Sequence, residues 1–501
     1  MWTRDQLFIG GRWLPSDGAE WLDVVSPTTE AFFGRVPSAT APDVERAVNA
    51  ARRAFDDGPW PRTSFDERAE ALARFVAAFE RRAAEAVDLQ IDEMGGVRKF
   101  LGPATHGVGP FLRRMIADGR TIALRDVRDG VTGKVVVLRE PLGVVAGIVP
   151  WNAPVMAAMT KVLPSLLMGC PILLKPAPES PLSAYLLADA FDEAGLPPGL
   201  LSVLPGGVAV GQALVSHPGV DMVTFTGSTG AGRQIAATCG QQVKPAALEL
   251  GGKSAAVILD DADLDRYLAV IVDNALRNTG QVCVATTRIL VARPQHNDVV
   301  DRLVDAVAAM KVGDPHDPQT DFGPLASARQ RERVEGYIAT GRDEGAKVVL
   351  GGGRPPGFDR GWFVEPTIFV GVDPSMTIAQ EEIFGPVLAV IPYGSDDEAV
   401  AIANDSPYGL GGAVYTSDPE RALAVATRIR TGTCSVNDGL PAGGGGPFGG
   451  YKESGLGRER GPEGLESFLE LKSVAFGTDD PPPRAQAIVQ PPSMTSVEPV
   501  M

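Results

Sequence analysis

The chain has 501 residues, with 46 Lys and Arg against 62 Asp and Glu, which gives a formal net charge of −16. This length argues for two or more domains, and a hydrophobic fraction of 44% with a charged fraction of 22% is typical of globular proteins and excludes wholesale disorder. The acidic balance opposes binding to a phosphate backbone, so we expect no nucleic-acid partner.

The spacing of the cysteines and histidines indicates in which compartment the protein works and whether it binds a metal. The four cysteines include no CxxC pair and the four histidines no HExxH pattern, so we predict neither a disulfide framework nor a metal site. A reducing, cytoplasmic location fits this usage, and the N-terminus has no apolar stretch long enough for a secretory signal. The uncharged stretch 142–160 is about as long as a bilayer requires, but Pro150 and Pro154 would interrupt it, so we predict no membrane span.

The first 139 residues predict a β entry, long helices and a hairpin. Residues 7–14 (LFIGGRWL) form the β entry, and residues 42–54 follow Thr40 with the spacing of a capped helix. Residues 65–92 predict one long amphipathic helix. At 121–139 the period changes to two around Asp129 and Gly130, which predicts a β-hairpin with exposed tips.

From residue 142 onward, short apolar strands alternate with helices. The predicted strands are 142–149, 171–175, 200–206, 221–227 and 246–252, and helices at 155–169, 181–195, 209–217 and 229–240 separate them. A second run has strands at 254–259, 287–291, 346–352, 363–372, 386–393 and 411–416. This alternation is typical of parallel sheets with helices on both faces, so we predict an α/β fold with two doubly wound domains.

Polar residues follow several strands of the first run, at the edge where such sheets bind ligands. Asn152, Lys175, the Gly-rich turn from Gly227 into Ser228, and Glu249 would meet there. A Gly-rich turn that opens a helix suits a pyrophosphate, although GSTGAG is not the GxGxxG fingerprint, and such turns are usually only turns. Glu249 lies in an apolar stretch, so its carboxylate is either ion-paired or held with a raised pKa for proton transfer.

Cys283 differs from the other three cysteines. A lone cysteine is usually a small buried hydrophobe, and Cys170, Cys239 and Cys434 fit that interpretation. Cys283 follows the small polar segment 278–282 (NTGQV) just before a new strand, which makes it the candidate nucleophile.

These residues lie in motifs that together resemble the aldehyde dehydrogenase superfamily over residues 7–476. The motifs occur in the order of that family: PWN at 150–152, KPA at 175–177, FTGS at 225–228, LELGGK at 248–253, GQVC at 280–283, EEIFGP at 381–386 and PFGGYKESG at 447–455. A single tripeptide would be weak, whereas seven in order exclude chance.

The resemblance implies an NAD(P)-dependent oxidation of an aldehyde to its acid. It assigns Cys283 as the nucleophile, Asn152 with the Cys283 backbone N–H as oxyanion donors, Glu249 as the base that activates water, and Glu459 as an aid to proton release. The implied cofactor contacts are Val149, Trp151, Lys175, Gly207, Gly211, Phe225, Gly227, Ser228, Leu250, Glu382 and Phe384.

The resemblance also implies a domain plan. Residues 1–120 and 141–250 would form a Rossmann-variant cofactor domain and residues 251–453 the catalytic domain. Residues 121–140 and 454–477 would form a β-ribbon oligomerisation arm, which implies a homodimer or homotetramer. We expect the Pro-rich tail 478–501 to be disordered.

Two features bear on cofactor and substrate choice. Pro178 stands where NAD-specific members commonly carry Glu, and the missing carboxylate removes repulsion against a 2′-phosphate, so NADP is the alternative cofactor. The segment 175–181 (KPAPESP) adds no new Arg or Lys for that phosphate, so NAD is our first choice. The acyl-pocket positions are mostly apolar and favour an aliphatic, terpenoid or aromatic aldehyde; they are Phe111, Met115, Met156, Val282, Val284, Ala442 and Phe448.

Two other interpretations start from the same residues. The chain could be a non-catalytic binder on the same scaffold, but Cys283, Glu249 and Asn152 are all retained. It could also be a cysteine acyl hydrolase, because a thioester-forming cysteine can cleave esters as well.

Overall fold

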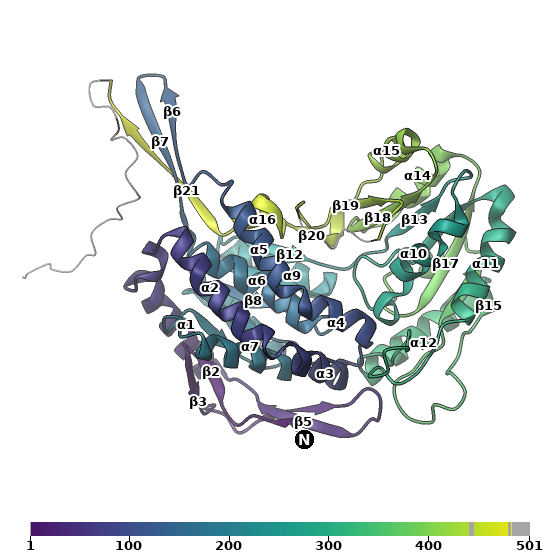
Figure 1. Cartoon of the computed structure of the whole chain (residues 1–501), viewed down its shortest axis with the longest axis horizontal. Helices are drawn as coiled ribbons and strands as arrows, with labels where there is room; N and C mark the ends of the chain where they lie inside the picture. The colour runs from purple at the N-terminus through teal and green to yellow at the C-terminus, as the bar shows by residue number, and fades with distance from the viewer. Residues whose placement is uncertain (1, 440–444, 479–481, 483–501) are drawn as a thin grey trace, which may run out of the picture.

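The computed structural model describes residues 2–439, 445–478 and 482, and its two lobes are each built on a large, mostly parallel sheet (Figure 1). The first lobe contains the N-terminal helices, and the second lobe follows residue 252. Ala442 and almost all of the predicted tail 478–501 lie outside the described residues.

The first sheet has eight strands in the order β20-β12-β11-β8-β9-β10-β2-β3. Its five central strands pair in parallel, and they are β8 (Val145–Ile148), β9 (Ile172–Lys175), β10 (Leu201–Val203), β11 (Met222–Thr226) and β12 (Ala246–Glu249). The hairpin of β2 (Leu7–Ile9) and β3 (Arg12–Leu14) closes one edge, and β20 (Gly455–Leu456) closes the other, both antiparallel. The alternating strand and helix pattern thus predicted the five parallel strands of this sheet, but not β20.

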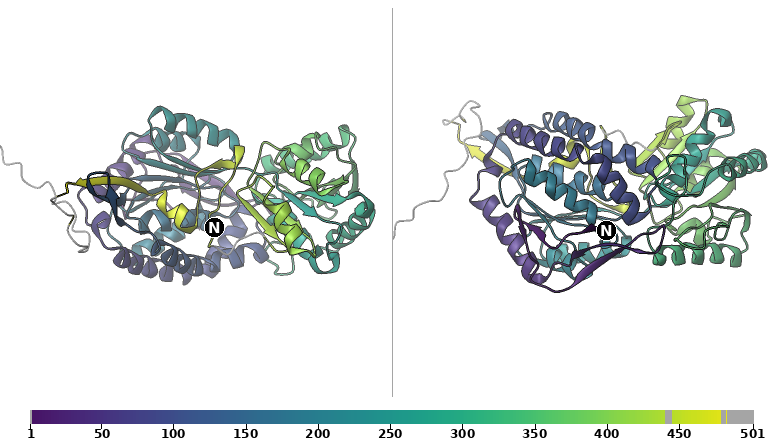
Figure 2. Two further views of the ribbon diagram at one scale, coloured as in Figure 1. Left: turned by 90° about the horizontal axis from the view of Figure 1, so that it is seen from above. Right: turned by 60° about the horizontal axis from the view of Figure 1, so that its bottom comes forward.

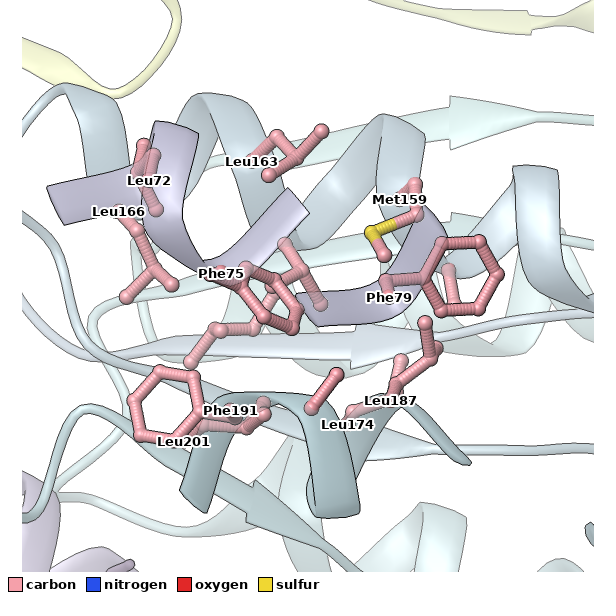
Figure 3. Packing of buried hydrophobic residues seen from close by; sticks show 14 of the residues in the cluster. Leu72, Phe75, Phe79, Met159, Leu163, Leu166, Leu174, Leu187, Phe191 and Leu201 are labelled. Carbon is pink, nitrogen blue, oxygen red and sulfur yellow. The ribbon is translucent and has the colours of Figure 1, made fainter. Parts of the chain in front are cut away.

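Alternating side chains of these strands feed two apolar layers, as a doubly wound sheet requires. Val145, Ile172 and Leu174 face one layer, which contains α2 (Phe65–Glu80), α5 (Val108–Gly119), α6 (Pro154–Leu167) and α7 (Leu182–Glu193). Figure 3 shows this layer, where Phe75 packs edge-on against Phe191 at 5.6 Å between ring centroids. Ala146 and Leu173 face the other layer, which contains α1 (Ala41–Asp56), α8 (Val208–Ser216) and α9 (Thr229–Gln241).

The single helix predicted for residues 65–92 is wrong. The structure has two helices, α2 and α3 (Ala83–Met94), with a break at Arg81 and Arg82. Both guanidinium groups donate to carbonyls of the last turn of α2, those of Ala77 and Ala78, and both pair with Glu193 of α7. These interactions satisfy the carbonyls that a continuing helix would have bonded.

The second sheet has seven strands in the order β15-β16-β17-β14-β13-β18-β19. Six of them were predicted: β13 (Ala255–Ile258), β14 (Arg288–Ala292), β15 (Lys347–Leu350), β16 (Thr367–Val370), β17 (Val387–Tyr393) and β18 (Gly411–Tyr415). The unpredicted strand is β19 (Thr433–Val436). Helices cover both faces, and they are α10 (Leu264–Leu276), α11 (His296–Ala308), α12 (Ala328–Asp343), α13 (Thr377–Gln380), α14 (Asp396–Asn404) and α15 (Pro419–Ala426) (Figure 2).

The predicted hairpin is a ribbon that projects from the first lobe. Strands β6 (Arg125–Gly130) and β7 (Gly133–Pro141) pair antiparallel, and β21 (Leu469–Phe476) adds a third strand (Figure 1). The segment 454–477 contributes to three parts of the fold. Strand β20 extends the eight-stranded sheet, and α16 (Gly461–Glu466) packs on α5 and α6. Only β21 joins the ribbon. A small sheet of β1 (Trp2–Thr3), β4 (Trp21–Val25) and β5 (Phe32–Pro37) lies outside the predicted elements.

None of the helices in the described part of the chain is both long enough and apolar enough to cross a membrane. The stretch 142–160 folds as β8, a turn and the start of α6.

Candidate active site

One cavity brings together the three predicted catalytic residues. It has a volume of about 430 Å³, and Asn152, Glu249 and Cys283 all line it. Asn152 follows β8 and Glu249 ends β12, so the first sheet supplies both, whereas Cys283 comes from the second lobe between α10 and β14. The site therefore lies where the carboxyl ends of the first sheet face the second lobe.

The segment before Cys283 is a tight turn with left-handed backbone. Asn278, Thr279 and Gly280 have φ angles of 53°, 58° and 72°, and the two non-glycine residues are fully buried. Hydrogen bonds tie the turn to Asn152: the Asn152 Nδ2 donates to the carbonyl of Gln281 at 2.9 Å, and the Asn278 Nδ2 donates to the carbonyl of Asn152 at 3.0 Å. These two bonds place the Asn152 amide beside the chain that leads into Cys283.

Gly280 allows this turn to approach a second loop. A Cβ atom at Gly280 would lie 2.1 Å from the carbonyl oxygen of Gly385, so no side chain fits. The positive φ also favours glycine. The close approach joins the Cys283 loop to the loop that contains Glu382 and Phe384.

Cys283 is a half-buried free cysteine. Burial, with the charges of Glu382 and Glu249, raises the pKa of the Cys283 thiol to about 12. The backbone N–H of Val284 and the charge of Arg460 act in the opposite direction. Ionisation of the nucleophile therefore needs a proton acceptor or added positive charge in the cavity.

Glu249 is a buried carboxylate with a raised pKa, and it forms no salt bridge with the described residues. Burial and the nearby charge of Glu459 raise its pKa well above 4.5, while Lys161, Arg458 and Arg460 lower it only in part. Among the described residues, no hydrogen-bond partner reaches its Oε2 atom. A Cβ atom at Gly449 would lie 2.7 Å from its Oε1 atom, so a glycine leaves room for this carboxylate.

The Gly-rich turn opens helix α9 as predicted. Ser228 caps the helix by accepting from the Ala231 N–H at 3.3 Å. A Cβ atom at Gly232 would lie 2.5 Å from the Leu250 side chain, so this glycine brings the helix close to the sheet. The free N–H groups at the start of α9 suit an anionic group such as a pyrophosphate.

Lys175 ends β9 with its ammonium group buried. Burial lowers its pKa to about 8, and its Nζ donates to the adjacent carbonyl of Pro176 at 3.1 Å. A Cβ atom at Gly211 would lie 3.6 Å from the Lys175 side chain. Gly207 is the N-cap of α8, and Gly211 lies on that helix. The Val149 N–H donates to the Lys175 carbonyl, and Phe225 lies on β11. A buried ammonium with one neighbouring acceptor is suited to bind ligand hydroxyl or phosphate oxygens.

The Glu382 loop is fixed from two directions. The Glu382 Oε1 accepts from the Gly252 N–H at 3.0 Å, and burial raises the pKa of Glu382 to about 7. On the other side, Gln330 of α12 donates to the carbonyl of Phe384 at 2.7 Å.

Phe384 reaches across to the first lobe. It has a φ of 62°, and its ring meets the Trp151 ring edge-on at 5.4 Å. This contact links the two lobes at the site.

The residues present fit a dinucleotide cofactor. They include the buried Lys175 ammonium, the N-terminus of α9, the Glu382 carboxylate and the paired rings of Trp151 and Phe384. When bound, a nicotinamide dinucleotide supplies the hydride acceptor. No group of three or more potential metal ligands occurs in the described part of the chain.

The substrate side of the cavity is mainly apolar. Every predicted acyl-pocket residue within the described chain lines it, and these are Phe111, Met115, Met156, Val282, Val284 and Phe448. Polar groups that the sequence did not indicate also line it, including Thr160, Arg114, Arg277 and Arg460.

Sequence reasoning missed Lys161, which is fully buried on α6. Its Nζ lies 2.5 Å from the Glu459 Oε1 and donates to the Thr224 hydroxyl at 3.1 Å. A lysine in an otherwise apolar helix was a usable signal, of the same kind as the one that drew attention to Glu249. Glu459 therefore lies next to Glu249 as an ion-paired group.

Sequence comparison agrees with this geometry. The family model described as the aldehyde dehydrogenase family matches residues 13–474. The chain is 44% identical over 472 residues to geranial dehydrogenase of Castellaniella defragrans, which covers 93% of this chain and 98% of that protein. It is 45% identical over 475 residues to 3-succinoylsemialdehyde-pyridine dehydrogenase of a Pseudomonas species, with 94% and 98% covered.

Solved structures match the fold over nearly the same span. An aldehyde dehydrogenase of Mycobacterium tuberculosis complexed with NAD+ gives a TM-score of 0.93 at 47% identity, with 95% of this chain and 99% of that chain covered. A mutant of aldehyde dehydrogenase C from Pseudomonas syringae, complexed with NAD+ and octanal, gives 0.89 at 40% identity, with 94% and 96% covered. The chain therefore belongs to the aldehyde dehydrogenase family of NAD(P)-dependent oxidoreductases.

Proposed function

We propose that this enzyme oxidises a neutral, largely apolar aldehyde of the aliphatic, terpenoid or aromatic class to the carboxylic acid. NAD+ is the preferred hydride acceptor and NADP+ the alternative. The cavity carries the proposal, because an apolar wall surrounds a nucleophile, an amide donor and a base. The relative named for geranial and the structure with octanal support the same substrate class.

The chemistry follows from the positions of the three groups. The Cys283 thiol loses its proton to water in the cavity, and its sulfur attacks the carbonyl carbon. The Asn152 amide with the Cys283 N–H holds the oxyanion of the thiohemiacetal; one such donor is worth about 3 kcal/mol. Loss of hydride from that carbon leaves a thioester on Cys283. Glu249 then takes a proton from water, the hydroxyl adds to the thioester carbon, and the carboxylic acid leaves as the sulfur is released.

We assign the steps to the two lobes. Residues 1–120 and 141–250 hold the dinucleotide, and residues 251–453 supply the nucleophile. The four free cysteines are consistent with work in a reducing compartment, for which the cytoplasm is our proposal.

A steady-state aldehyde screen tests this function. Geranial, octanal and benzaldehyde should each be oxidised with NAD+ or NADP+, detected as absorbance of the reduced nicotinamide. Cys283→Ala should lower turnover by about 10⁴-fold or more, because no other group replaces the nucleophile.

Cys434→Ala is the matched control. Cys434 is a half-buried thiol on β19 outside the cavity lining, so its loss should leave turnover unchanged. Ester hydrolysis that needs no nucleotide, combined with no oxidation of any aldehyde, would instead identify an acyl hydrolase.

A further inference from the structure

Arg460 is a cation in the cavity wall that the reaction above does not use. It lies between Glu459 and helix α16 and lines the same cavity as Cys283 and Glu249. Its guanidinium carbon is 5.1 Å from the centre of the Phe448 ring, and Phe448 lines the cavity as well. The side chain therefore packs against Phe448 in the wall of the cavity that Cys283 and Glu249 also line.

The Arg460 guanidinium has no anionic partner in the described chain. No carboxylate there forms an ion pair with it, and its buried Nε atom has no hydrogen-bond acceptor. Arg458, two residues earlier, differs because its Nη1 donates to the carbonyls of Gly450 and Gly457. Leaving a half-buried guanidinium unpaired is costly, and the contact with the Phe448 ring offsets that cost only in part.

The backbone at Arg460 is also strained. Its φ of 61° and ψ of 169° fall in a region that is essentially confined to glycine. A glycine would satisfy this backbone without strain, yet the position carries a long charged side chain. Strain of this kind at a cavity wall is typical of functional positions.

The groups around Cys283 indicate what the charge acts on. Glu382 and Glu249 face the thiol as carboxylates, and Arg460 is the cation that lowers the pKa of Cys283. Glu249 in turn is faced by Glu459, Lys161, Arg458 and Arg460. The charge of Arg460 therefore acts on both reacting groups.

We propose that Arg460 stabilises the ionised form of Cys283 by its charge, without touching the aldehyde. The inference rests on the assignment of Cys283 as the nucleophile. In this role the missing counter-ion of Arg460 is the thiolate itself, which forms only when the nucleophile is activated.

Alkylation of Cys283 tests the proposal without nucleotide or aldehyde. The full-length enzyme is treated with iodoacetamide across a pH series, and the modified Cys283 peptide is followed by mass spectrometry. In Arg460→Met the alkylation curve should move to higher pH by about one unit, so the rate below the midpoint falls roughly tenfold. Arg460→Lys keeps the charge and should remain close to the wild-type curve.

Two further variants separate charge from structure. Arg460→Gly removes the charge and the backbone strain together, so it should fold with a higher melting temperature while its alkylation curve moves as in Arg460→Met. Arg458→Met removes a neighbouring charge from the same wall and should leave the Cys283 curve in place.

Coincident alkylation curves for the wild type, Arg460→Met and Arg460→Gly would overturn the proposal. If Arg460→Met selectively lowered kcat/KM for carboxylate-bearing aldehydes without changing alkylation, Arg460 would be a substrate anchor and the proposal would be wrong. A failed aldehyde screen with a shifted alkylation curve would count against the proposed function alone.

Discussion

At the scale of single residues, the pKa values of two buried ionisable side chains, Glu249 and Cys283, set the chemistry of this site. Burial and neighbouring carboxylates raise the pKa values of both Glu249 and Cys283, so both side chains hold their protons to higher pH than free ones do. A neutral glutamic acid cannot take a proton from water, so the hydrolytic step needs the deprotonated fraction of Glu249.

This state predicts how turnover depends on pH. Because a raised pKa delays loss of the Glu249 proton, kcat should increase with pH through a limb well above the usual carboxylate range. Glu249→Gln should remove the limb and lower kcat about 10²-fold or more, with an initial burst of reduced nicotinamide as the thioester accumulates. The measurements are kcat against pH and rapid-mixing absorbance.

Glu463→Gln serves as the control for the pH experiment. Glu463 is an exposed carboxylate on α16, so its loss should leave the limb unchanged. A limb of the same midpoint in Glu249→Gln would show that another group is the base.

Residues with a local sequence signature could be predicted, and residues placed only by folding could not. Cys283, Asn152 and Glu249 stand in short motifs, and the structure brings all three to one cavity. Arg460 lies in the charged segment GRERGPEG, where one arginine cannot be told from another until β20 and α16 place it against Phe448.

At the scale of elements, the left-handed turn before Cys283 determines where the nucleophile lies. Gly280→Ala should separate this turn from the Gly385 loop, because the added Cβ would overlap the Gly385 carbonyl. The positive φ and the overlap together should lower the free energy of unfolding by about 1–3 kcal/mol, with a fall in kcat/KM. Thermal unfolding and steady-state kinetics measure both effects.

Gly336→Ala is the matched control, because Gly336 lies within helix α12 with open space around its Cβ position. It should raise the free energy of unfolding by about 0.5–1 kcal/mol. Equal stability of Gly280→Ala and the wild type would contradict the role given to the turn.

The accuracy of the predicted elements depended on hydrophobic periodicity. The parallel strands were predicted because a buried strand is a short apolar run between turn residues. The break between α2 and α3 contains neither Gly nor Pro, and it depends on Arg81 and Arg82 meeting Glu193 far along the chain. The two-residue strand β20 is too short to give a periodic signal, and pairing with β12 defines it.

At the scale of the whole molecule, the ribbon presents apolar side chains to solvent. Leu471 of β21 is 68% exposed and Val127 of β6 is 44% exposed, and within the described residues both are edge strands of the ribbon. Such exposure is typical of a surface that another subunit covers.

We therefore predict a homodimer or homotetramer that assembles through the ribbon. Leu471→Asp should shift the assembly toward the monomer, because a charge would be buried at the contact. Light scattering after size-exclusion chromatography measures the molar mass. Leu423→Asp on α15, which is 64% exposed and distant in sequence from the ribbon strands, should leave the mass unchanged. A monomeric wild-type enzyme would refute the prediction.

Glu249 and Glu382, the two carboxylates near Cys283, also affect how readily oxidants attack this cysteine. Peroxides attack thiolates and react slowly with protonated thiols, and burial beside Glu249 and Glu382 keeps the Cys283 thiol protonated. The resting enzyme should therefore resist conversion of Cys283 to sulfenic acid even though that cysteine faces an open cavity. Vulnerability would be confined to the moments of turnover when the sulfur is ionised, so the same electrostatics that slow activation also preserve the nucleophile between substrates.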